Sequence, residues 1–222
     1  MDFLKTDNIF LFVPNIIDYL RVVTLFVSFY YMPDDPLKCC FWYLFSGLLD
    51  AFDGHAARTL NQGSRLGALL DMLTDRCATM CLMGALCYFY PKYMLFFQFS
   101  MFVDIISHWF HFYGSLMKGA SSHKQLDLSA NPILRHYYHN KINLFVMCAA
   151  NELFYCMLYL TYFTPGPMLG VGWFSVGLWN LILYLSAPLS LIKLGISILQ
   201  FYAACHNIAA IDMEERKAAK EK

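Results

Sequence analysis

Two closely spaced apolar segments carry four carboxylates and several small residues at fixed intervals. The pattern is D-x2-D-G-x2-A-R-x8-G-x3-D-x3-D, and its fixed positions are Asp50, Asp53, Gly54, Ala57, Arg58, Gly67, Asp71 and Asp75. At 100° per residue of α-helix, the first aspartate pair shares a helix face with two small residues, and the second pair shares a face with Gly67. The spacing therefore predicts two helices that each present a pair of carboxylates.

The connector between these helices, residues 58–65, is short, so the helices are expected to be antiparallel neighbours whose carboxylates converge. Carboxylates that close together in apolar surroundings are costly unless protons or cations compensate them. Oxygen ligands in this number suit Mg²⁺ or Mn²⁺, with room for two ions about 4 Å apart. We therefore predict a metal site whose ligands are Asp50, Asp53, Asp71 and Asp75.

Two other interpretations account for these acids less well. An acid-rich helix that faces water would have polar neighbours, whereas the flanking residues are Leu, Phe, Met and Cys. A proton or cation pathway through a transporter fits acids in apolar helices, but it has no need of the small residues or the arginine. Gly54 and Ala57 leave space for a ligand against the helix backbone, and Arg58 can bind phosphate oxygens with its planar fork. Together these residues favour a diphosphate site.

The complete pattern from Asp50 to Asp75 resembles the signature of the CDP-alcohol phosphotransferase family, and a chance match is on the order of 10⁻¹⁰ per starting position. The resemblance implies an all-α membrane fold of six helices that forms a homodimer, with a polar cavity open to the cytosol. It also implies that Asp75 acts as general base as well as metal ligand. The CDP part of the donor would be held by Gly54, Ala57, Arg58 and Ser64.

The reaction implied by the resemblance is transfer of a phosphatidyl group from CDP-diacylglycerol to an alcohol, with CMP as the leaving group. His55, the turn at 61–63 and the connector at 121–141 are similar to the eukaryotic members of this family that use myo-inositol, so myo-inositol is the expected acceptor. Glycerol 3-phosphate or serine as acceptor, or a CDP-choline donor, is the alternative within the family. Two alternatives lie outside the family. A cation or proton transporter would release no CMP from CDP-diacylglycerol, and an Asp-rich membrane prenyltransferase would use prenyl diphosphates and need no cytidine.

The composition of the chain indicates an integral membrane protein. Its 222 residues are 59% hydrophobic and only 14% charged, against about 25% charged in soluble domains. The formal net charge is zero, so no nucleic-acid partner is expected. The eight cysteines lie mostly in apolar runs without a C-x-x-C pair, which predicts free thiols rather than disulfides or a zinc site.

Six apolar segments are long enough to cross a bilayer, which needs roughly 20 residues. They are expected at Ile16–Met32, Leu37–Ala57, Leu66–Tyr90, Tyr93–Met117, Ile142–Phe163 and Trp173–Cys205. The last segment is long enough to tilt, to kink at Pro188 or to continue beyond the bilayer. We predict a single domain over 1–222, with a short interfacial helix in 1–13 and a cytosolic tail at 212–222.

The distribution of Lys and Arg predicts the orientation of the chain. With six crossings, both termini share a side with the connectors at 58–65 and 118–141, and that side holds most of the Lys and Arg outside the spans. The positive-inside rule then puts the termini and the aspartates at the cytosolic face. The family resemblance implies the endoplasmic reticulum as the membrane.

Further polar residues interrupt the apolar segments. Asp104, His108 and His111 share one helix face, and we predict that Asp104 and His108 contact the acceptor. The alternative is an internal Asp–His pair that stabilises the bundle. Because Asp104 would partly repel a phosphate, an uncharged polyol is the expected acceptor.

The remaining polar residues are given structural interpretations. Asn151 and Glu152 are expected to bridge helices, with a place in the lining of the cavity as the alternative. Lys193 is expected to reach the membrane surface or to pair with an acid rather than to bind a ligand. Arg21 is expected to meet a lipid phosphate or Asp18. The basic connector at 118–141 is interpreted as a solvated loop near anionic lipid, with a lid over the acceptor as the alternative.

Overall fold

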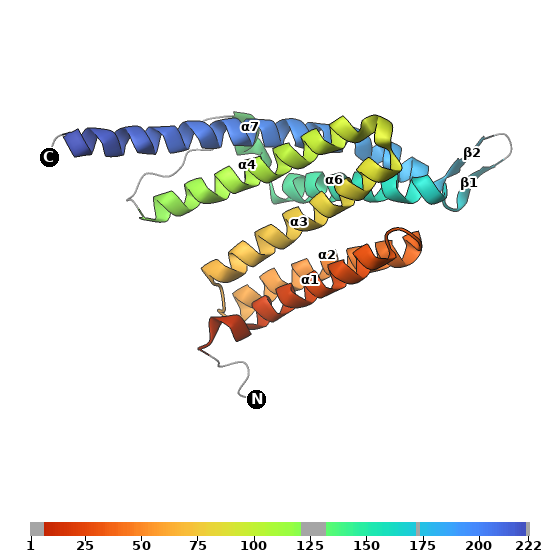
Figure 1. The fold of residues 1–222 in the computed structure, drawn as a ribbon, viewed down its shortest axis with the longest axis horizontal. Helices are drawn as coiled ribbons and strands as arrows, with labels where there is room; N and C mark the ends of the chain where they lie inside the picture. Colours follow the sequence, from red (N-terminus) through yellow and green to blue (C-terminus); the bar gives the residue numbers. More distant parts are fainter. Residues whose placement is uncertain (1–6, 121–131, 172–173, 221–222) are drawn as a thin grey trace.

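A computed structural model describes residues 7–120, 132–171 and 174–220 of the chain (Figure 1). Its long helices are α1 (Val13–Tyr31), α2 (Pro36–Thr59), α3 (Arg65–Phe89), α4 (Met94–Ala120), α6 (Lys141–Phe163) and α7 (Leu178–Lys220). Its shorter elements are the 3₁₀ turns η2 (Ile9–Leu11) and η3 (Pro91–Tyr93), the helix α5 (Pro132–His139), and an antiparallel hairpin of β1 (Met168–Val171) and β2 (Phe174–Gly177). The long helices run alternately in opposite directions, so the described fold is an all-α bundle with one small hairpin.

Local capping sets the turn that brings the two aspartate pairs together. Ser64 caps α3 by accepting a hydrogen bond from the backbone N–H of Gly67 at 2.9 Å. Asn61 has a φ of 52°, a left-handed conformation that asparagine tolerates better than most residues. These two residues reverse the chain within the short turn at 60–64. The second half of α2 and the first half of α3, which carry the aspartates, therefore lie at the same end of the bundle.

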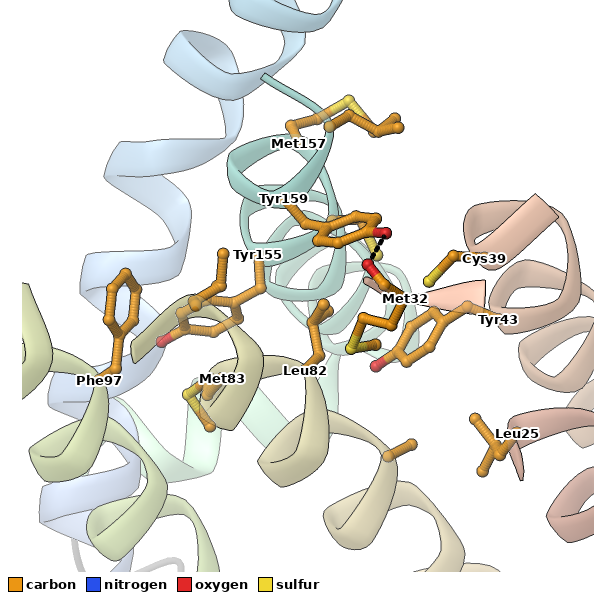
Figure 2. Packing of buried hydrophobic residues seen from close by; sticks show 14 residues of the cluster. Leu25, Met32, Cys39, Tyr43, Leu82, Met83, Phe97, Tyr155, Met157 and Tyr159 are labelled. Atoms are coloured by element: carbon orange, nitrogen blue, oxygen red, sulfur yellow. Dashed lines mark hydrogen bonds between the residues drawn. The ribbon is translucent and has the colours of Figure 1, made fainter. Parts of the chain in front are cut away.

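The apolar core fills the half of the bundle away from that turn (Figure 2). Leu82, Met83 and Leu86 of α3 are at most 2% exposed and belong to a cluster with side chains of α1, α2, α4 and α6. The Tyr159 hydroxyl of α6 donates a hydrogen bond to the Met32 carbonyl at 2.7 Å, which joins α6 to the end of α1. Because apolar side chains fill this half, the charged groups of α1, α2 and α3 gather in the other half.

Large apolar side chains also cover the outside of the bundle. Tyr88, Leu95 and Phe145 are each more than 70% exposed. Extended exposed apolar surface is expected for a protein that lies in lipid. By length and composition, α1, α6 (at Ile142–Phe163) and α7 are each able to cross a membrane. The aspartates and arginines of α2 and α3 lower the mean hydropathy of those helices.

The predicted segments match the helices to within a few residues, except for the last. For Trp173–Cys205 the predicted start was wrong, because α7 begins only at Leu178, after the hairpin. The helix continues to Lys220, which is one of the outcomes expected for this long segment. Most of the predicted tail at 212–222 is therefore part of α7. Of the predicted interfacial helix in 1–13, residues 1–6 lie outside the described residues. The described part contains one 3₁₀ turn, η2, with Phe10 63% exposed.

Two other expectations can be compared with the structure. All eight cysteines are free thiols, as predicted. The connector proposed as a loop or lid contains α5, whose Leu134 is fully buried together with Ile196 of α7. His123, Lys124 and Asp127 of that connector lie outside the described residues.

Candidate active site

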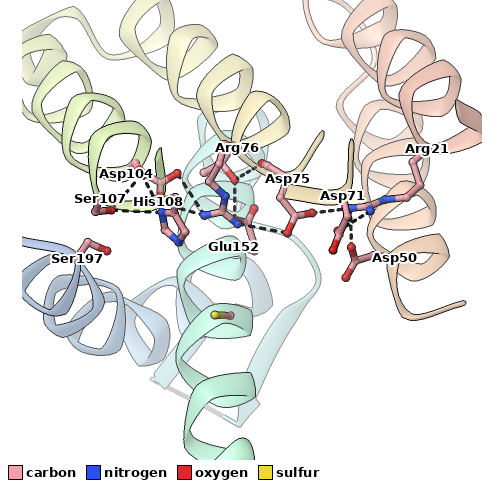
Figure 3. Close-up of polar contacts among 12 residues, drawn as sticks. Arg21, Asp50, Asp71, Asp75, Arg76, Asp104, Ser107, His108, Glu152 and Ser197 are labelled. Atoms are coloured by element: carbon pink, nitrogen blue, oxygen red, sulfur yellow. Dashed lines mark hydrogen bonds and ion pairs between the residues drawn. The ribbon is translucent and has the colours of Figure 1, made fainter. Parts of the chain in front are cut away.

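The predicted aspartates converge on one arginine, Arg21 of α1. Figure 3 shows Asp50, Asp71 and Asp75 beside it. Its guanidinium nitrogens lie 2.5–3.1 Å from carboxylate oxygens of Asp18, Asp50, Asp53, Asp71 and Asp75. The side chain of Arg21 is 2% exposed, which favours the second of its two expected partners, Asp18, over a lipid phosphate. The expected contact with Asp18 is present, but it is one of five.

Close packing of α1 against α2 and α3 holds Arg21 among the carboxylates. The Ser46 hydroxyl of α2 donates a hydrogen bond to the Arg21 carbonyl at 3.1 Å. The Gln62 side chain accepts one from the first backbone N–H of α1 at 2.9 Å. A Cβ at Gly67 would lie 2.6 Å from the Asn15 side-chain oxygen, so a residue larger than glycine would push α3 away from α1.

The carboxylates form two groups that are close enough to share a cation. Asp50, Asp71 and Asp75 make one group, and Asp18, Asp53 and Asp71 make the other. Within each group the candidate ligand oxygens lie within 4.8 Å of one another. Asp71 belongs to both groups, which is the arrangement expected of a ligand that bridges two ions.

The charge and chemistry of this cluster fit divalent metal. Five negative carboxylates against one positive arginine leave a formal charge of −4. All the donors are hard oxygen atoms, which Mg²⁺ and Mn²⁺ prefer. Asp18 is an additional member that the sequence motif missed, because it lies on a different helix from the motif.

A cavity of about 170 Å³ adjoins the cluster at the turn between α2 and α3. Its lining includes three of the four predicted donor residues, Gly54, Ala57 and Ser64, together with three of the clustered aspartates, Asp18, Asp53 and Asp71. The Arg58 side chain is exposed, and its guanidinium lies over Gly54, 3.4 Å from the position that a Cβ there would take. Ser64 already accepts the capping hydrogen bond of α3, so its hydroxyl hydrogen is the atom left for a ligand.

A second and larger cavity, of about 310 Å³, lies on the other side of the aspartates and is called the inner chamber. It is bordered by α1, α2, α3, α6 and α7, and its polar lining includes Asp50, Asp75, Arg76, Asn151, Glu152 and Lys193. Because Asp53 and Asp71 line the smaller cavity, the acidic cluster separates the two spaces. Two ligands could therefore meet at the aspartates from opposite sides.

Asp75 is held between two guanidinium groups. One of its oxygens accepts a hydrogen bond from Arg21, and the other accepts one from Arg76 at 3.3 Å. Arg76 also contacts both carboxylate oxygens of Asp104, at 3.1 and 3.2 Å. This line of alternating charges, visible in Figure 3, fixes Asp75 at the wall of the inner chamber.

Asp104 and His108, the predicted acceptor residues, lie on the far side of Arg76 from Asp75 (Figure 3). The His108 Nδ1 atom is 2.8 Å from the Asp104 carbonyl oxygen and 3.5 Å from its carboxylate. Neither residue is among those that line the inner chamber. The geometry favours the alternative, an internal Asp–His pair that supports the bundle, and their direct contact with an acceptor stays a prediction.

Three residues near the aspartates were not predicted from the sequence to belong to the site. Arg76 was not singled out, although an arginine next to Asp75 in an apolar helix was a signal. Glu152 does bridge helices, as expected: its carboxylate accepts hydrogen bonds from Tyr43 of α2 at 2.9 Å and Thr79 of α3 at 2.8 Å. Lys193 reaches neither the surface nor an acid within 4 Å among the described residues, but is buried at the inner chamber.

Comparison with known proteins supports the family resemblance that the aspartate motif indicated. Residues 11–192 match the model of the family described as CDP-alcohol phosphatidyltransferase. The chain is 55% identical to the CDP-diacylglycerol–inositol 3-phosphatidyltransferase of Homo sapiens, over 96% of the chain and 99% of that protein. The proteins of the same name in Drosophila melanogaster and Schizosaccharomyces pombe are 43% and 44% identical, over 100% and 98% of the chain and 96% and 97% of those proteins.

No solved structure matches the chain. The family match covers the whole aspartate motif and most of the bundle, and the relatives align over nearly their full lengths. The chain belongs to the CDP-alcohol phosphatidyltransferase family.

Proposed function

We propose that this protein transfers the phosphatidyl group of CDP-diacylglycerol to myo-inositol, giving phosphatidylinositol and CMP. The observation that carries the proposal is the pair of cavities that meet at one acidic cluster. The cavity beside Gly54 and Ala57 suits the nucleotide diphosphate of the donor, and the inner chamber suits a small polar acceptor. The names of the relatives at 43–55% identity supply the identities of the two substrates.

In this proposal the residues around the smaller cavity bind the donor. The open backbone at Gly54 and Ala57 lets the CDP part lie against α2, and Ser64 donates a hydrogen bond from the start of α3. Arg58, which lies over Gly54, binds the phosphate oxygens with its planar fork. Asp50, Asp53, Asp71 and Asp75, with Asp18 beside them, would hold Mg²⁺ or Mn²⁺, which would supply positive charge to offset the diphosphate and the CMP leaving group.

The acceptor side of the reaction depends on Asp75. Its carboxylate takes the proton of the attacking hydroxyl while the acceptor oxygen bonds to the lipid-side phosphorus. The bond from that phosphorus to the CMP oxygen breaks with its electron pair, and CMP leaves. Arg21 and Arg76 hold the Asp75 carboxylate from two sides, so it faces the acceptor without having to reorganise.

The proposal also includes the membrane setting of the reaction. We propose that all six long helices cross the bilayer as one domain over 1–222, with η2 at the interface and the end of α7 in the cytosol. The excess of Lys and Arg on the side of the α2–α3 turn supports a site that faces the cytosol. The family resemblance supports the endoplasmic reticulum membrane and a homodimer. Donor acyl chains would then stay in lipid while the polyol enters from water.

An acceptor panel tests the proposed function. Purified protein with CDP-diacylglycerol and Mg²⁺ is given myo-inositol, glycerol 3-phosphate or serine, and the lipid product is identified by mass. We expect phosphatidylinositol as the product, with CMP released only in the presence of myo-inositol. A faster reaction with glycerol 3-phosphate or serine would leave the family chemistry intact but overturn the assigned acceptor.

A further inference from the structure

The inner chamber contains polar side chains that the transfer chemistry does not use. Asp50 and Asp75 belong to the acidic cluster, and Arg21 and Arg76 are committed to carboxylates. Glu152 of α6 and Lys193 of α7 also line the chamber, yet neither contacts the aspartate motif within ion-pair distance among the described residues. Charged residues inside a membrane bundle are costly and are retained mainly for function.

Glu152 is positioned to accept hydrogen bonds from a ligand. One of its carboxylate oxygens accepts from the Thr79 hydroxyl at 2.8 Å, and the other accepts from the Tyr43 hydroxyl at 2.9 Å. Each carboxylate oxygen has a second lone pair, so the fixed side chain can also accept from the hydroxyl groups of a bound molecule. Glu152 lines the chamber, and Figure 3 shows it beyond Asp75 as seen from Asp50.

Lys193 is positioned to donate hydrogen bonds to the same molecule. It is 5% exposed, and its ammonium has one hydrogen-bond acceptor among the described residues, the Ser197 hydroxyl at 3.1 Å. An ammonium has three N–H donors, so two remain for a ligand in the chamber. A buried charge with so few partners is expensive, and polar ligand atoms would lower that cost.

We infer that Glu152 and Lys193 determine acceptor specificity by binding the non-reacting hydroxyl groups of a neutral polyol in the inner chamber. This inference rests on the proposed function, since it requires the acceptor to be a polyol attacked at Asp75. One hydroxyl lies at Asp75, and the hydroxyls across the ring exchange hydrogen bonds with Glu152 as acceptor and Lys193 as donor. The chamber volume of about 310 Å³ suits a small ligand of this class.

The charges of the chamber argue for a neutral acceptor over a phosphorylated one. Of its lining cations, Arg21 and Arg76 each bind carboxylates within 3.3 Å, and only Lys193 lacks an acid within 4 Å among the described residues. A phosphate would need several free cationic donors. It would also be repelled by Asp50, Asp75 and Glu152, which line the same space.

Kinetics of Lys193→Met and Glu152→Gln test the inference. Glu152→Gln keeps the shape of the side chain, and Lys193→Met keeps an unbranched chain that is one atom shorter, so the bundle should remain folded. We expect the KM for myo-inositol to rise roughly tenfold or more, the usual effect of losing a hydrogen bond to a charged group. The KM for CDP-diacylglycerol should stay unchanged, because neither residue lines the donor cavity. Lys38→Met is the matched control, since the Lys38 side chain is 60% exposed and far from the site.

Deoxy-inositols separate direct contact from a structural effect. If Lys193 binds one hydroxyl, an inositol lacking that hydroxyl is a poor acceptor for the wild-type protein, and Lys193→Met adds no further loss with it. The inference would be overturned if Lys193→Met lowered activity by the same factor with every deoxy-inositol as with myo-inositol. It would also be overturned if both variants kept the wild-type KM for myo-inositol. Phosphatidylinositol formation by the wild-type protein in the same assay distinguishes that failure from a failure of the proposed function.

Discussion

Replacing Asp71 with Asn is expected to reduce phosphatidylinositol formation to less than about a hundredth of the wild-type rate. Asp71 is the one aspartate that belongs to both groups of converging carboxylates. Asparagine keeps the size of the side chain but removes a charge from both groups, so it weakens every cation bound there. The rate is measured at saturating CDP-diacylglycerol and myo-inositol over a range of Mg²⁺ and Mn²⁺ concentrations.

The matched control for this prediction is Asp34→Asn. Asp34 is exposed in the connector between α1 and α2, at the other end of the bundle, and should tolerate the change. Chelation of divalent metal should abolish turnover by the wild-type protein, and its return should restore it. Retention of a tenth or more of the activity by Asp71→Asn would contradict the assignment of the cluster as a metal site.

Replacing Arg21 with Ala is expected to make the fold depend on divalent metal. Arg21 contacts five carboxylates, of which Asp18 and Asp53 are buried with it, and removing one partner of a buried ion pair costs about 3 kcal/mol or more. Without added metal, the free energy of unfolding in detergent should fall by about that amount. Mg²⁺ should restore much more stability to Arg21→Ala than it adds to the wild-type protein.

Thermal unfolding with and without Mg²⁺ measures this coupling. Arg216→Gln, an exposed change near the end of α7, should show the wild-type response. Equal stabilisation of wild-type protein and Arg21→Ala by Mg²⁺ would mean that the arginine and the metal do not share the same carboxylates.

The aspartate motif could be predicted because its information is local. The spacing of Asp50, Asp53, Asp71 and Asp75 follows from helix geometry, and the short turn leaves one way to pack their helices. The structure brings those four side chains together around one cation. Their convergence needed no knowledge of the rest of the fold.

The partners of the motif could not be predicted because they depend on tertiary packing. Arg21 and Asp18 lie about 30 residues before the motif, and nothing in their spacing says which face of α1 meets α2. Lys193 was expected to reach the surface, which is the usual behaviour of a lysine in a spanning helix, or to pair with an acid. Its burial depends on how α7 packs against α4 and α6, which periodicity alone does not specify.

The correct start of the last helix could have been predicted from local sequence features. Gly166 has a φ of 80°, a left-handed conformation that glycine adopts easily, and it stands between two prolines before the hairpin. The apolar residues of the two strands look like the start of a spanning segment by composition. The end of α7 was also readable, since Ala, Glu, Lys and Arg after Asp212 are strong helix formers.

The most direct test of the account compares CMP and phosphatidylinositol from the same reactions of wild-type protein and Asp75→Asn. With CDP-diacylglycerol, myo-inositol and Mg²⁺, the wild-type protein should release CMP and form phosphatidylinositol in equal amounts. Asp75→Asn should form neither at a detectable rate but still bind CDP-diacylglycerol, because the remaining aspartates of the cluster can hold a cation. CMP release without phosphatidylinositol, or undiminished transfer by Asp75→Asn, would contradict the account.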